Sequence, residues 1–183
     1  MKFQMYVQVE VKDKNGKIQR IRKRKCSSYV RHMIDQLMVS MGYVNLSGVN
    51  TAGGSVTLAP GADEFRVDGP AGVTTKGIRV GTGTTPVAIG DYALATAIAE
   101  GTGAGQLSHG VTSTIAPTTV GSARQFTIAR TFTNNSGASI TVNEVALYRY
   151  SVTGSFMFER TLLTFSIANG ASATVTYTLS VTV

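Results

Sequence analysis

Cysteine, tryptophan and charged side chains are all scarce in this sequence. The one cysteine, Cys26, excludes an internal disulfide bond and a metal site built from several cysteines. Charged residues make up 15% of the 183 residues, whereas about a quarter is usual. Hydroxyl groups and glycine, or contacts with other protein, must therefore cover much of the surface. No run of about 20 apolar residues is present, and no charged segment followed by an apolar one opens the chain. We therefore expect neither a transmembrane helix nor a signal peptide.

Groups that catalyse reactions are equally few. The two histidines, His32 and His109, lack metal-ligand spacing, and no Gly-x-Ser-x-Gly nucleophile motif occurs. The glycine-rich stretches 81–83 and 101–105 do not match a dinucleotide-binding or phosphate-binding fingerprint. Cys26 follows a run of cations, which lower a thiol pKa, but an unreactive thiol is the more frequent case. We expect no enzymatic activity, no cofactor and no metal site.

Positive charge is concentrated at the N-terminal end. The chain has a net charge of +7, yet residues 1–32 alone carry ten basic and two acidic residues, or +8. Residues 33–183 carry seven basic and eight acidic residues, or −1. Threonine has the opposite distribution, since all 24 threonines lie at or after Thr51. This shift predicts a basic hairpin plus helix over 1–44, packed on a Thr/Gly-rich β-sandwich body over 45–183.

Hydrophobic periodicity predicts a hairpin and a helix at the N-terminal end. Apolar residues alternate over 3–11, and Asn15-Gly16 predicts a tight turn into a return strand over 17–24. Apolar residues at spacings of three and four over 28–41 predict an amphipathic helix. Ser27 or Ser28 could cap its start and Gly42 its end.

The rest of the chain reads as short strands separated by turns. Strands are predicted at 55–59, 64–68, 77–81, 107–115, 123–133, 139–150, 155–165 and 174–183. The apolar phase changes at Asn143-Glu144, which a β-bulge or burial on both faces would explain. Residues 82–105 read as a long loop. This pattern favours a mainly β protein, an antiparallel β-sandwich of the jelly-roll or immunoglobulin-like kind.

The strongest electrostatic feature is a run of cations on the predicted return strand. Its members, taken as a candidate contact face, are Arg20, Arg22, Lys23, Arg24 and Lys25. Alternation predicts that the three arginines lie on one face of the strand and the two lysines on the other. The run could contact phosphates. It could equally guard a sheet edge or meet an acidic protein surface.

Two longer stretches carry a family resemblance. The first is Gly77–Pro86 (GIRVGTGTTP), continuing to Asp91–Leu94 (DYAL), and the second is Arg130–Tyr148 (RTFTNNSGASITVNEVALY). With the closing strand Val175–Leu179 (VTYTL), they resemble small structural proteins of tailed bacteriophage virions. The resemblance covers roughly residues 77–183. It implies a β-rich, non-enzymatic capsid-decoration, collar or tail component, built into symmetric rings or shells and located in the virion after assembly in the host cytoplasm.

The leading hypothesis is a virion structural protein that packs against capsid or tail proteins and forms a homo-oligomer, without membrane contact. Its expected contacts are the basic hairpin and the 82–105 loop. The candidate interface residues in that loop are Thr82, Pro86, Asp91, Tyr92 and Leu94.

Two other functions stay open. DNA contact through the basic hairpin predicts binding that weakens steeply with salt. A receptor or carbohydrate-binding tail module needs exposed aromatic side chains, and the only plausible platforms are Tyr6, Tyr92, Tyr148 and Tyr150. Tyrosines in strands more often pack against cross-strand neighbours.

Overall fold

The computed structural model describes residues 2–26, 29–40, 45–59, 66–151 and 153–182. Its elements, in chain order, are β1 (Lys2–Lys12), β2 (Ile18–Lys25), α1 (Arg31–Ser40), β3 (Leu46–Val49), β4 (Ser55–Leu58), β5 (Gly77–Gly81), β6 (Ser108–Val120), β7 (Ala123–Thr133), β8 (Ile140–Ser151), β9 (Gly154–Ile167) and β10 (Ser172–Thr182).

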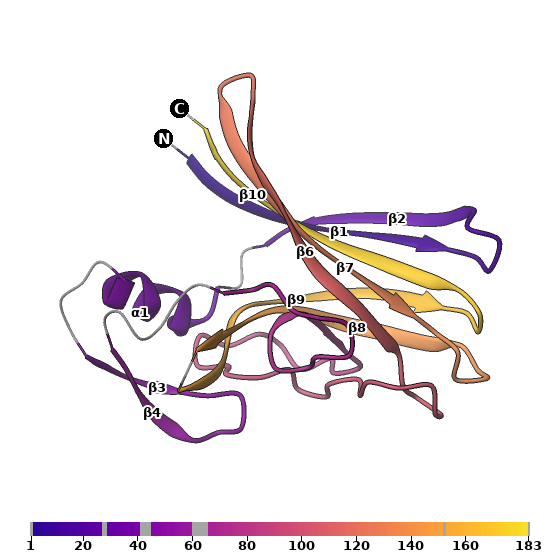
Figure 1. The fold of residues 1–183 in the computed structure, drawn as a ribbon, viewed down its shortest axis with the longest axis horizontal. Coiled ribbons are helices and arrows are strands. Elements are labelled where there is room, and N and C mark those ends of the chain that lie inside the picture. The colour runs from indigo at the N-terminus through magenta and orange to yellow at the C-terminus, as the bar shows by residue number, and fades with distance from the viewer. Residues whose placement is uncertain (1, 27–28, 41–44, 60–65, 152, 183) are drawn as a thin grey trace.

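The described residues form two packed sheets with a small β3-β4 hairpin and one helix at their side (Figure 1). The large sheet has the strand order β2-β1-β10-β7-β6, and the small sheet has the order β5-β8-β9. All strand pairs are antiparallel. The antiparallel β-sandwich with a single helix that the sequence predicts is therefore confirmed.

The basic N-terminal hairpin is part of the large sheet. Strand β1 lies between β2 and β10, and its register runs from Lys2 opposite Thr182 to Lys12 opposite Ser172. The alternation seen in the sequence turns Met5, Val7 and the following valines inward, where they are buried. The hairpin therefore completes one layer of the sandwich, and the two chain ends lie side by side (Figure 1).

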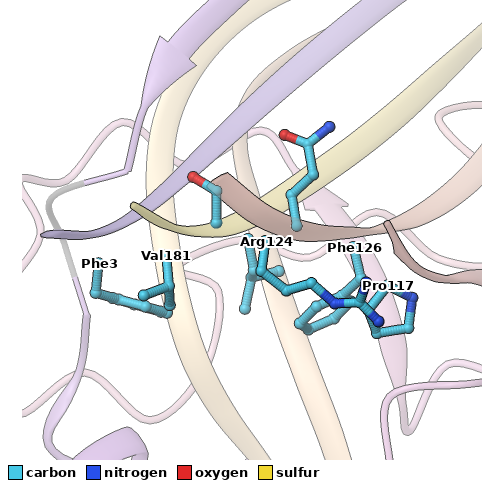
Figure 2. A pocket seen from close by; sticks show the side chains of 8 residues that line it. Phe3, Pro117, Arg124, Phe126 and Val181 are labelled. Atoms are coloured by element: carbon cyan, nitrogen blue, oxygen red, sulfur yellow. The ribbon is translucent and has the colours of Figure 1, made fainter. Parts of the chain in front are cut away.

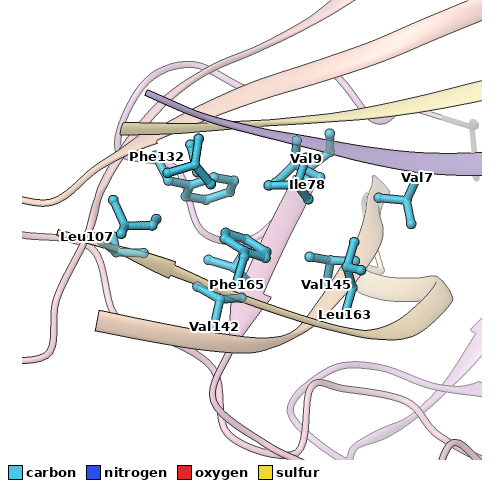
Figure 3. Packing of buried hydrophobic residues seen from close by; sticks show 14 of the residues in the cluster. Val7, Val9, Ile78, Leu107, Phe132, Val142, Val145, Leu163 and Phe165 are labelled. Carbon is cyan, nitrogen blue, oxygen red and sulfur yellow. The ribbon is translucent and has the colours of Figure 1, made fainter. Parts of the chain in front are cut away.

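The core lies between the two sheets (Figure 3). Val9 and Phe132 reach down from the large sheet, and Val145 and Phe165 reach up from the small sheet; all four are at most 1% exposed. Burying each such side chain contributes roughly 1.5–3 kcal/mol. This packing is why strands from both ends of the chain are held in one domain.

Strand β8 is buried on both faces from Glu144 to Arg149. The register shifts between Val142 and Glu144, so the predicted bulge is confirmed. One face of β8 contacts the core, and the other carries a second apolar cluster that includes Val30 and Leu94. The small sheet is thus the middle layer, with the large sheet on one side and loop residues on the other.

Helix α1 is oriented differently from what its pattern suggests. An amphipathic helix is expected to bury its apolar stripe. The buried residues of α1 are instead His32, Gln36 and Val39, and the exposed apolar ones are Ile34, Leu37 and Met38. The ring of His32 packs edge-on against Phe156, with centroids 5.7 Å apart, and its Nε2 accepts the Val49 N–H at 3.0 Å. The helix is therefore fixed by the bond of His32 to Val49 and by the packing of Val39, and its apolar stripe stays exposed. No helix in the described part of the chain is long and apolar enough to cross a membrane.

Some predicted elements differ from the structure or lie outside it. Of the strand predicted at 64–68, the structure describes residues 66–68, and they do not form a strand. Arg66 makes only an isolated bridge to Tyr150. The proposed helix caps at residues 27, 28 and 42 lie outside the described residues.

A carboxyl group is buried between the two sheets, where β9 faces β10. Glu159 is fully buried, and the hydroxyl of Tyr177 donates to its Oε2 at 2.5 Å, while the hydroxyl of Thr161 donates to its Oε1. Burial raises the pKa of Glu159 to about 7, although these bonds lower it in part. Burial, together with the nearby Glu159, also raises the pKa of the Cys26 thiol far above its ordinary value. Glu159 is therefore the group in the core that titrates near neutral pH.

The raised pKa of Glu159 makes stability depend on pH. Between pH 4.5 and about 7 the folded chain keeps a proton that the unfolded chain releases, so the free energy of unfolding falls as pH rises through this window. In the native chain, we expect the free energy of unfolding to fall by about 3 kcal/mol across this window. Glu159→Gln should abolish this fall. Urea unfolding of both chains at about pH 5 and about pH 8 measures this difference. Glu10→Gln, a change on the outer face of β1, is the control, and an equal pH dependence in the Glu159 variant and the native chain would contradict the prediction.

Candidate functional site

The candidate basic face lies on β2, at the edge of the large sheet. Arg20, Lys23, Arg24 and Lys25 are exposed, and Arg22 is half-buried. Arg22 stands opposite Val9 and Arg24 opposite Val7, so the arginines lie on the inner side of the sheet; Lys23 stands opposite Gln8 on the outer side. The predicted division of arginines and lysines between the two faces is confirmed.

Two of these cations already have partners within the chain. The Arg24 guanidinium donates to the Leu162 carbonyl of β9, and the Lys23 ammonium lies 4.9 Å from the centre of the Tyr6 ring. The first contact ties the edge of the large sheet to the small sheet. A row of cations on an edge strand also opposes pairing with another strand.

The loop that follows β5 is held against the outer face of the small sheet by one buried carboxylate. Glu144 of β8 is fully buried, and its Oε1 accepts the backbone N–H groups of Gly83 at 3.1 Å and Thr96 at 2.9 Å. Its Oε2 accepts the N–H of Ala95 at 3.2 Å. Bonds from amides to an ionised acceptor are stronger than neutral ones, so Glu144 joins both ends of the loop to β8.

Arg160 of β9 completes this network. Its Nε donates to Glu144 Oε2 at 2.6 Å, and its two terminal nitrogens donate to Asp91 Oδ2 at 2.9 Å and to the Thr85 carbonyl at 3.0 Å. Burial lowers the pKa of Arg160, but the bonds to Glu144 and Asp91 outweigh it and leave that pKa above its ordinary value. The guanidinium is thus a charged clamp between the sheet and the middle of the loop.

The five candidate interface residues of the loop divide into two groups. Thr82, Pro86 and Tyr92 are exposed and remain available for contact. Asp91 is bonded to Arg160, and Leu94 is only 7% exposed in a cluster with Tyr148, whose hydroxyl accepts the Leu94 N–H at 2.8 Å. Asp91 and Leu94 therefore hold the loop in place and are not part of an exposed contact surface on this chain.

Two glycines of the resembling stretch are explained by the same carboxylate. A Cβ at Gly81 would lie 2.5 Å from Glu144 Oε1, and a Cβ at Gly83 would lie 2.5 Å from the same oxygen. Any larger residue would displace the carboxylate from its amides. In this chain, the Gly-Thr-Gly sequence lets the backbone approach a side chain of the same protein. In a phosphate-binding loop, such a sequence lets the backbone approach a ligand.

A second buried cation, Arg130, holds the segment that leads into β5. Arg130 of β7 is 1% exposed and donates to the carbonyls of Val73 at 2.7 Å, Gly110 at 2.8 Å and Ile78 at 3.1 Å. Burial and the nearby Arg79 lower its pKa to about 10. Arg79, also buried, donates to the carbonyls of Thr74 and Ile98. Ile78 and Gly110 lie in β5 and β6, whereas the other carbonyls lie outside the named strands. These arginines therefore tie irregular segments to the two sheets.

The groups that suggest chemistry do not converge. His32 and His109 lie on different elements, and burial lowers the pKa of both, to about 3 for His109. Cys26 is 2% exposed. Among the described residues, no three His, Cys, Asp or Glu side chains gather as metal ligands do.

The tyrosines proposed as sugar platforms are also dispersed. Tyr148 is 5% exposed and bonded to the loop, so it cannot serve as a platform. Tyr6 lies beneath Lys23, and Tyr150 lies near Lys76, whose ammonium is 5.9 Å from the ring centre. These positions favour packing roles over a shared sugar-binding surface.

The Glu144–Arg160 pair was not predicted from the sequence. One signal was present, because a charged residue within a strand of apolar residues, such as Arg160, needs a partner if buried.

Comparisons with protein-family models, with curated proteins and with solved structures find no match. The function must therefore be inferred from the residues and their geometry.

We predict that Glu144→Ala releases the loop. Removing one partner of a buried ion pair leaves Arg160 uncompensated, which costs about 3–5 kcal/mol of unfolding free energy. Amide hydrogen exchange should accelerate at Gly83, Ala95 and Thr96 beyond the general effect of lower stability. Asp68→Ala is the control, because the Asp68–Arg66 pair is about half exposed and such pairs contribute only about 0–1 kcal/mol. Equal effects of the two variants would show that Glu144 does not hold the loop.

Proposed function

We propose that this chain is a non-enzymatic structural component of a tailed-phage virion that packs against capsid or tail proteins and against copies of itself. The observation that carries the proposal is that the two resembling stretches interlock. Strand β5 of the first pairs with β8 of the second, and Glu144 of the second binds Gly83 of the first. The residues behind the resemblance are therefore the ones that join β5, β8 and the following loop.

The use of the buried charges supports a structural role. Enzymes direct groups with perturbed pKa values into a cleft where substrate binds. Here Glu144 is directed at backbone amides, while Arg79 and Arg130 are directed at backbone carbonyls. These side chains make long irregular segments rigid, which suits a protein whose surface loops are contacts in an assembly.

The outer face of the large sheet also suits contact with protein. Its middle strand β10 presents Thr174, Thr176 and Thr178 beside the threonines of β7, and the hydroxyls of Thr131 and Thr174 lie 2.8 Å apart. The part of this face formed by β10 and β7 is polar and uncharged, so burying it against another protein has a small desolvation cost.

The proposal predicts that the chain is found in purified particles. An antibody against the recombinant chain should label intact virions of the phage that encodes it, and mass spectrometry should detect the chain after the particles are washed at high salt. Particles that lack the chain, with all of it in the soluble fraction of infected cells, would overturn the proposal. A soluble phage protein of similar abundance is the control for carry-over.

DNA contact through β2 is the alternative that the exposed cations favour. Under the structural proposal, we expect no duplex DNA binding at about 0.15 M salt. DNA contact would instead give an affinity that falls with salt, at a slope of about −0.9 for each phosphate neutralised. A fluorescence anisotropy titration measures this slope, with Arg20→Glu as the test variant. Lys76→Glu, outside the basic run, is the matched control.

A further inference from the structure

The large sheet is longer than the layer beneath it. At the end where β1 begins and β10 finishes, its strands continue past the small sheet, and the turn between β6 and β7 projects with them (Figure 1). All residues of β6 from Ser113 to Val120 are exposed. The inner face of this projecting end carries Phe3, Phe126 and Val181 (Figure 2). Phe3 is 46% exposed although its ring contacts Tyr29, with centroids 6.1 Å apart, and Phe126 and Val181 are half-buried.

An apolar cleft opens between this projecting end and α1. It has a volume of about 330 Å³, and its walls include Phe3 and Leu179 from the sheet and Met33 and Leu37 from the helix. All its lining side chains are apolar. A second hollow of about 300 Å³ continues from it beneath the projecting strands, sharing Phe3, Phe126 and Leu179. The two hollows adjoin, and together they are called the groove below.

Helix α1 adds a second uncovered apolar surface beside the groove. Ile34, Leu37 and Met38 are 58%, 41% and 49% exposed, because the helix packs on the body through His32, Gln36 and Val39. Contiguous exposed apolar surface of this kind marks a contact site. In a layered fold, each apolar face needs a covering layer. This chain therefore has two uncovered faces at the same end.

We propose that a second copy of this chain fills the groove, with the outer face of α1 in each copy lying on the projecting end of the large sheet in the other. The inference rests on the self-packing part of the proposed function and names its surface. Such an exchange is self-complementary about a two-fold axis, as isologous dimers require. It covers both apolar faces of both copies at once.

The distribution of charge favours a second copy at this end. Strand β2 extends from the middle of the large sheet toward the end away from α1 (Figure 1), and its cations lie opposite residues 6–11 of β1. Among the described residues, Arg124 is the only charged one that lines the groove, and the charges of α1 are paired, with Arg31 Nε 3.5 Å from Asp35 Oδ2. Two chains of net charge +7 repel each other least when they meet here.

The chemistry of the groove also favours protein over a small ligand. Ligand pockets combine apolar walls with a few polar groups that orient the ligand, and the lining of the main cleft has no polar side chain. Phenylalanine, methionine and leucine dominate it instead. Aromatic residues and methionine are enriched in the cores of protein interfaces, where charged groups are depleted.

Light scattering of the full chain tests the inference. We expect a dimer that persists from roughly 0.1 M to about 1 M salt, because apolar contacts are not screened. Ile34→Glu, an exposed change that leaves the monomer core intact, should weaken dimerisation at least about tenfold. Ile18→Glu is the matched control, since Ile18 is an exposed isoleucine of β2 away from the groove. A chain that is monomeric throughout, or a dimer weakened equally by both variants, would overturn the proposal.

Cross-linking provides a second measurement that does not depend on a destabilising variant. Met38→Cys and Val181→Cys chains, mixed and oxidised, should form a covalent heterodimer, whereas Met38→Cys mixed with Ile18→Cys should not. The reverse pattern would place the interface elsewhere. A dimer joined through the groove but absent from particles would overturn the proposed function and leave this inference standing. A monomer that is found in particles would do the opposite.

Discussion

The outer half of this molecule depends on a carboxylate that is buried under a loop. Moving two charges out of water costs several kcal/mol for each ion, and a complete set of partners must offset that cost. Glu144 obtains its set from Arg160 and from the amides of Gly83, Ala95 and Thr96. If any of these groups moves away, a buried charge loses one of its bonding partners. The loop and the small sheet therefore form one cooperative unit.

The bulge in β8 is what directs Glu144 toward the loop. Side chains alternate along a strand, so Val142 in the core would place residue 144 in the core as well. The register shift between Val142 and Glu144 changes this phase, so Val145 packs in the core and Glu144 faces outward. The Asn143 side chain also donates to the Thr82 carbonyl at 3.0 Å. A local backbone irregularity thus carries the long-range attachment of the loop.

Much of the fold could be predicted from local sequence signals, whereas contacts between distant parts of the chain could not. The strands at 77–81 and 123–133 and the bulge agree with the structure because periodicity and turn chemistry are local. The attachment of the 82–105 loop could not be predicted, because the partners of Glu144 in the loop are backbone amides, which every residue except proline carries. For α1, periodicity identified an apolar stripe but could not say what covers it. Ile34 and Met38 are exposed because His32 has the better partner, the N–H of Val49.

The same hairpin gives the molecule two unlike ends. Strand β1 carries Phe3 at the groove near its start and leads through the turn at Gly16 to β2, whose cations lie opposite residues 6–11 of β1. An apolar end binds through desolvation and keeps its strength at high salt, whereas a cationic end attracts acidic surfaces at a distance and loses that attraction in salt. A dimer joined at the apolar ends would present a basic face at each outer side. Such a particle can contact two acidic surfaces at once, and the gain from linking the two contacts exceeds what either face provides alone.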